Sequence, residues 1–69
     1  MENNFKEKLK SLRKEKNLGQ IELAKELGVS KGTISLWENG LREPTMSSLI
    51  RIAKYFDISV DFLIGTTED

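Results

Sequence analysis

The apolar residues of this 69-residue chain recur at intervals of three and four, which is the spacing of one face of an α-helix. No segment alternates apolar and polar residues as a half-buried strand does, and no internal repeat is present. The pattern therefore predicts an all-α fold, a compact bundle of five helices over residues 4–16, 19–27, 30–39, 46–56 and 60–64. The side chains expected in its core are Phe5, Leu9, Leu12, Leu23, Ala24, Leu27, Ile34, Trp37, Leu49, Ile52, Ala53, Phe56 and Leu63.

Short polar residues stand at or just before the start of four of the five predicted helices, where a side-chain oxygen can accept a hydrogen bond from the first turn. Asn3 or Asn4 is expected to cap the first helix, and Ser30, Thr45 and Ser59 the last three. We expect one folded domain over residues 1–65, because the chain is too short for two, and a flexible acidic tail over residues 66–69.

The composition excludes several classes of site. The chain has no cysteine and no histidine, so disulfides and the usual zinc ligands are excluded and no metal or other cofactor is expected. Apolar runs are too short for a membrane span or a signal peptide, so we expect a cytoplasmic protein.

Asp57 and Asp61 are spaced four apart, but they flank a helix start where the helix dipole stabilises acids. The sequence thus predicts no enzyme.

The charge balance gives a mixed signal about a nucleic-acid partner. The formal net charge is zero, which argues against strong nonspecific binding to DNA. Residues 1–31 nevertheless carry eight Lys or Arg against five acids, while residues 32–69 carry three against six. One face of the folded chain can therefore still be basic.

Two short predicted helices are joined by a turn of about three residues, Gly28 to Ser30, which is the arrangement of a helix-turn-helix unit. Gly28 can end a helix in the left-handed conformation, and Val29 is the apolar residue expected to fill the inside of the turn. A reader helix over residues 30–39 would bury Ile34 and Trp37 and present its other side to the major groove. The outward residues would be short and mostly uncharged, as close approach to bases requires.

The sequence resembles the lambda-repressor and Cro-like helix-turn-helix proteins, also called the xenobiotic response element family, from about residue 5 to residue 65. The matching pieces are Leu12-Arg13, Gln20, Leu23-Ala24, Leu27-Gly28-Val29-Ser30, Thr33-Ile34-Ser35, Trp37-Glu38-Asn39-Gly40, Pro44, Leu49, Ile52-Ala53 and Leu63-Ile64-Gly65. The resemblance implies a bacterial or phage transcriptional regulator, in particular a repressor, that binds specific double-stranded DNA.

The resemblance also implies residue roles. Base-reading positions correspond to Lys31, Gly32, Thr33, Ser35 and Leu36, and phosphate-binding positions to Gln20, Ser30, Asn39 and Arg42. Lys31 can donate to guanine, whereas the hydroxyls can instead bond the local backbone. Leu36 can either pack on a thymine methyl group or have no role. Glu38 is expected to be structural, bonding Arg13 or a loop, because an acid facing phosphate would weaken binding.

Two positions depart from the family pattern. Gly19 stands where a serine or threonine usually caps the second helix, a change that should cost only a few tenths of a kcal/mol. Gly32 removes a side chain from the reading surface and should lower helix stability by roughly 0.5–1 kcal/mol.

Family members usually bind two half-sites as dimers, so a homodimer on an inverted-repeat operator is expected. Candidate dimer contacts are Ile58, Val60, Phe62 and Ile64, which could instead simply close the bundle. Two alternatives to a complete regulator remain open at this point. One is an antitoxin or another protein-interaction module of the same fold, and the other is the N-terminal domain of a longer repressor.

Overall fold

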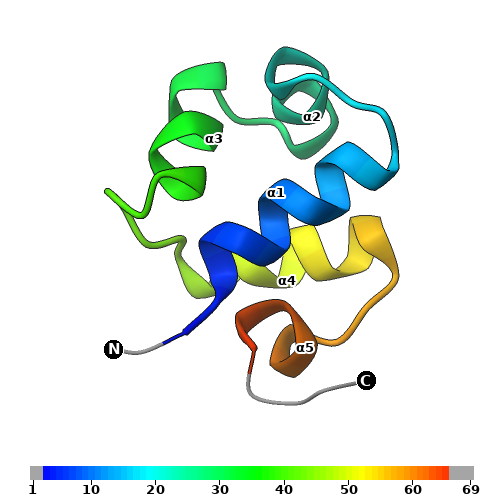
Figure 1. The fold of residues 1–69 in the computed structure, drawn as a ribbon, viewed down its shortest axis with the longest axis vertical. Coiled ribbons are helices and arrows are strands. Elements are labelled where there is room, and N and C mark those ends of the chain that lie inside the picture. Colours follow the sequence, from blue (N-terminus) through cyan, green and yellow to red (C-terminus); the bar gives the residue numbers. More distant parts are fainter. Residues whose placement is uncertain (1–2, 66–69) are drawn as a thin grey trace.

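The computed structural model describes residues 3–65, and this part of the chain forms five α-helices (Figure 1). They are α1 Phe5–Glu15, α2 Gln20–Leu27, α3 Lys31–Glu38, α4 Met46–Phe56 and α5 Val60–Ile64. The predicted all-α, five-helix fold is confirmed. The predictions for the first three helices were too long because they included flanking cap residues, which bond to the helix end without helical dihedrals. The predicted tail, residues 66–69, lies outside the described residues.

The helix α1 crosses the middle of the molecule, with α2 and α3 on one side and α4 and α5 on the other (Figure 1). It packs against α3 and α5, while α2 packs against both α3 and α4. This arrangement puts one shared core between all five helices. The buried apolar residues are Phe5, Leu9, Leu23, Ala24, Leu27, Ile34, Trp37, Ile52, Ala53, Phe56 and Leu63. Leu12 and Leu49, predicted in the core, are only partly buried at its edge.

The helix starts are capped largely as the sequence predicts. The hydroxyls of Ser30, Thr45 and Ser59 each accept a hydrogen bond from the backbone N–H three residues later, at 3.0–3.1 Å. At the start of α1, the cap position and the capping hydrogen bond belong to different asparagines. Asn4 is the cap residue by position, but it is the Asn3 side-chain oxygen that accepts from the Phe5 N–H, at 3.0 Å.

One long-range contact was not predicted from the sequence. Arg51 on α4 donates from Nη1 to the backbone carbonyl of Leu27 at 2.9 Å, and so satisfies a carbonyl at the end of α2. Because Arg51 lies off the apolar stripe of α4, its position in the sequence indicates only a solvated side chain. The contact ties α2 to the opposite side of the bundle.

Within residues 3–65, four large apolar side chains are exposed: Ile21, Leu41, Met46 and Ile50. Met46 and Ile50 lie four residues apart on α4 and so share one face of that helix. None of the helices described for residues 3–65 has the length and apolar character required to cross a membrane.

Candidate nucleic-acid interface

The turn between α2 and α3 has the geometry that the sequence predicts. Gly28 ends α2 with φ +73°, a left-handed conformation that favours glycine. The N–H of Val29 then donates to the carbonyl of Ala24 at 3.0 Å, and the Val29 side chain packs against the core. Ser30 begins α3 immediately afterwards as its N-cap. The turn therefore holds α3 at a fixed orientation against α2.

The helix α3 has one buried side and one open side. Ile34 is fully buried, and Trp37 and Glu38 are 3% and 5% exposed. The rings of Trp37 and Phe5 of α1 pack edge to face, with ring centroids 6.2 Å apart at 75°. These contacts fix the rotation of α3 about its own axis and so decide which residues face outward. The predicted inward position of Ile34 and Trp37 is confirmed.

The five predicted base-reading residues all lie outside the core. Lys31 and Gly32 are exposed, whereas Thr33, Ser35 and Leu36 are half-buried. A Cβ atom built on Gly32 would make only an ordinary contact with the Ser30 hydroxyl, at 3.8 Å, so this position has room for a side chain. The structure thus brings these residues onto one helix, and their roles toward DNA stay a prediction.

The hydroxyl groups on α3 are engaged locally in the free chain. Ser30 and Thr33 share a hydroxyl–hydroxyl hydrogen bond of 2.9 Å, and Ser30 also caps the helix. Asn39 donates from its side-chain amide to the Ser35 hydroxyl at 3.3 Å. Since hydroxyls both donate and accept, these groups keep hydrogen-bonding capacity beyond the local contacts.

Glu38 is the centre of a buried polar network that joins three helices. Its Oε2 accepts from Arg13 Nε at 2.7 Å, and its Oε1 accepts from Arg13 Nη2 and from Gln20 Nε2, both at 3.1 Å. Only 1% of the Glu38 side chain and 11% of the Arg13 side chain are exposed. The hydrogen bond to Glu38 raises the pKa of Arg13 above its ordinary value. The predicted structural role of Glu38 is confirmed.

The predicted phosphate-binding residues differ in how free they are. Gln20 is the first residue of α2, but its amide is already bonded to Glu38. Asn39 and Arg42 are exposed at the end of α3 and in the loop that follows. Among residues 3–65 the guanidinium of Arg42 has no ion pair. The sequence offered no signal for the link between Gln20 and Glu38, which are eighteen residues apart.

The start of α2 shows how the chain accommodates Gly19. The backbone N–H of Gly19 donates to the carboxylate of Glu22, which completes one half of a capping box without a cap side chain. The side chain of Glu22 therefore compensates in part for the missing serine or threonine.

The four candidate dimer contacts are all half-buried. Ile58 and Val60 pack against the core, and the amine of Lys8 lies 4.1 Å from the centre of the Phe62 ring. Ile64 lines a small hollow together with Pro44 and Leu49. Bundle closure thus accounts for much of their burial, and their role in dimerisation stays a prediction.

The chain is similar in sequence or in structure to several known proteins. The HTH-type transcriptional activator BcrR of Enterococcus faecalis is 47% identical over 64 residues, which are 93% of this chain and 31% of BcrR. The crystal structure of the P22 c2 repressor with a synthetic operator has a TM-score of 0.82 at 33% identity, covering 87% of this chain and 91% of that one. Hydroxypropylphosphonic acid epoxidase from S. wedmorenis has a TM-score of 0.79 at 35% identity, covering 88% of this chain but 32% of the enzyme.

The chain spans between 31% and 56% of the length of the first three curated relatives that it matches. The family model described as "Helix-turn-helix" matches residues 9–63, which include α2, the turn and α3. The matched segment begins inside α1 and ends within α5, so it covers most of the shared core. The chain therefore belongs to the helix-turn-helix family of lambda-repressor-like proteins.

Proposed function

We propose that this chain is the DNA-binding domain of a transcriptional regulator and reads double-stranded DNA with the open side of α3. The observation that carries the proposal is the α2–turn–α3 unit, in which Ile34, Trp37 and Glu38 are buried and the small residues of α3 face outward. Such a helix can approach base edges in the major groove, where each base pair presents a distinct set of donors and acceptors. The likeness to the P22 c2 repressor supports this reading.

In this proposal the residues divide into two groups. Lys31 donates to a guanine, Thr33 and Ser35 bond bases or phosphates, and Gly32 and Leu36 allow close contact with the groove floor. Gln20, Ser30, Asn39 and Arg42 hold the sugar–phosphate backbone on either side. Gln20 does so while bonded to Glu38, which fixes its amide at the start of α2.

The zero net charge has a consequence for specificity. Nonspecific affinity for DNA comes almost entirely from phosphate neutralisation, so a neutral domain should bind random sequence weakly. A regulator of this kind must obtain its affinity from base contacts and from a second half-site. We therefore propose a homodimer on an inverted repeat, with α5 contributing contacts between the two copies.

The regulatory action that we propose is repression by a protein of the bacterial cytoplasm and its nucleoid. The P22 c2 protein is a repressor, whereas BcrR is an activator, so a reporter gene carrying the operator tests the sign directly. The epoxidase shares about a third of its length with this chain, which limits the likeness to one part of that enzyme. We propose no enzymatic activity for the chain.

Selection from a randomised duplex library at near-physiological salt tests the proposal. We expect one enriched motif, arranged as an inverted repeat with half-sites about 34–36 Å apart. The matched control is a Leu36→Glu variant, which places an acid on the open side of α3 and should enrich nothing. Lack of enrichment by the folded wild-type chain would refute DNA recognition and favour a module that binds a protein partner.

A further inference from the structure

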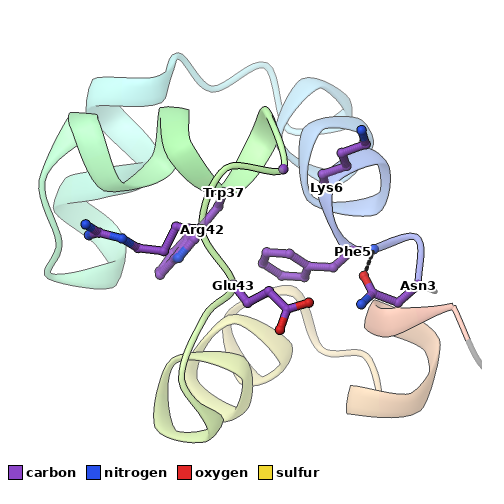
Figure 2. A pocket seen from close by; sticks show the side chains of 7 residues that line it. Asn3, Phe5, Lys6, Trp37, Arg42 and Glu43 are labelled. Carbon is purple, nitrogen blue, oxygen red and sulfur yellow. Dashed lines mark hydrogen bonds between the residues drawn. The ribbon is translucent and has the colours of Figure 1, made fainter. Parts of the chain in front are cut away.

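Lys6, on the first turn of α1, lies beside Gly40, which follows the proposed reader helix α3 and its C-cap Asn39. A Cβ atom built on Gly40 would be 3.0 Å from Lys6 Cδ and 3.4 Å from Lys6 Nζ. The Lys6 side chain therefore occupies the space that a side chain at residue 40 would fill. Figure 2 shows Lys6 extending from α1 at the edge of the hollow that lies between α1 and the loop after α3. The chain accommodates this close approach because residue 40 has no side chain, and its φ of +73° also favours glycine.

The face of α1 that carries Lys6 is the face that meets α3. Lys6 and Arg13 are seven residues apart, so they share one side of the helix. Arg13 uses this side to reach Glu38 on α3. Lys6 thus lies two turns before Arg13 on the side of α1 that faces α3. It is next to the carboxy-terminal end of α3, where Asn39 is exposed.

The cations of α1 differ in what they contact. Arg13 is paired with Glu38, and the amine of Lys8 lies over the ring of Phe62. The amine of Lys16, the residue after the helix, lies over the ring of Tyr55, and Lys10 and Lys14 are exposed. Lys6 is exposed, and no carboxylate within residues 3–65 forms a salt bridge with it. Its charge is therefore available to a ligand.

A hollow of about 210 Å³ opens beside Lys6, with Phe5 and Trp37 at its base and Arg42 on another part of its rim. Glu43 also lines it, but its carboxylate lies on the opposite side of the Phe5 ring from the Lys6 amine (Figure 2). Within residues 3–65, Lys6 and Arg42 near the end of α3 thus have no ion pair, and their charged groups point in different directions (Figure 2).

We propose that Lys6 binds a phosphodiester of the DNA backbone at the carboxy-terminal end of α3. The proposal rests on the function proposed above and adds a contact from a helix outside the helix-turn-helix unit. Lys6 and Arg42 then hold the backbone from two directions where α3 leaves the groove. Phosphate contacts of this kind fix the register of a protein on the duplex without carrying sequence information.

The test is the salt dependence of binding to a selected duplex and to a scrambled duplex, measured by fluorescence anisotropy. Each phosphate contact contributes about 0.9 to the slope of log K against log salt concentration. Lys6→Gln should lower the slope by about that amount and weaken both duplexes by the same factor, whereas Lys6→Arg should keep the wild-type slope. Lys54→Gln is the matched control, because Lys54 is exposed on α4, across the bundle from α3, and should change nothing.

Thermal melting separates the proposal from a structural role. Because α3 has no basic residue in its last turn, Lys6 could instead stabilise the negative end of the helix dipole. A lower melting temperature of Lys6→Gln with an unchanged salt slope would overturn the proposal in favour of that role. Lack of duplex binding by the wild-type chain would instead refute the proposed function itself.

Discussion

Replacing Glu38 by alanine should destabilise the whole domain, because Glu38 joins α1, α2 and α3. The change leaves the Arg13 guanidinium, 11% exposed, without its carboxylate, and removes the acceptor of the Gln20 amide. Breaking a buried ion pair by deleting one partner typically costs about 3–5 kcal/mol. A domain of this length has a total stability of roughly 3–10 kcal/mol, so the variant should be marginally folded or unfolded.

Urea and thermal unfolding followed by circular dichroism measure this effect. A loss of about 3 kcal/mol should lower the melting temperature by roughly 12 °C or more in a domain of this size. The double variant Arg13→Met with Glu38→Leu provides the control, since replacing both partners by apolar residues of similar volume is often neutral. It should recover most of the lost stability.

A loss below about 1 kcal/mol in Glu38→Ala would refute this reasoning. That result would mean that the Arg13–Glu38 pair behaves like an exposed surface ion pair, for which such values are typical. The network would then not be what holds the reader helix against α1.

Four further substitutions give distinct expected outcomes. Lys31→Ala should relax the preference at one base position by about 1–3 kcal/mol, measured by repeating the library selection. Arg42→Ala should weaken all sequences alike and lower the salt slope by about one, measured by anisotropy. Trp37→Ala should cost about 3–5 kcal/mol of unfolding free energy, and a variant that melts like the wild type would contradict its core position. Gly32→Ala should raise stability by roughly 0.5–1 kcal/mol, because the position is open and helical, while changing the selected motif.

The fold could be predicted from the sequence because local signals agree with one another. The stripe of Leu49, Ile52 and Phe56, the caps Thr45 and Ser59 and the turn at Gly28 each depend on neighbours within a few residues. Asn17, two residues after the end of α1, has a φ of 58°, a conformation that asparagine tolerates. The ends of the first three helices differ from the prediction by one residue, and Leu12 and Leu49 lie at the edge of the core rather than inside it.

The contacts between distant residues were harder to predict. The structural role of Glu38 followed from the argument that an acid would repel phosphate, and Arg13 was one of its two expected partners, a loop being the other. The bond from Gln20 to the same carboxylate, and that from Arg51 to Leu27, depend on how helices pack and leave no periodic pattern in the sequence. The position of Lys6 beside Gly40 likewise depends on the packing of α1 against α3, which no local pattern indicates.

Mapping of amide chemical-shift changes by NMR, as the chain is titrated with its selected duplex, identifies the surface that meets DNA. If the open side of α3 reads DNA, the largest changes should fall on α3, the first turn of α2 and the loop from Gly40 to Arg42. Changes confined to α4 and α5, with α3 unaffected, would contradict the account.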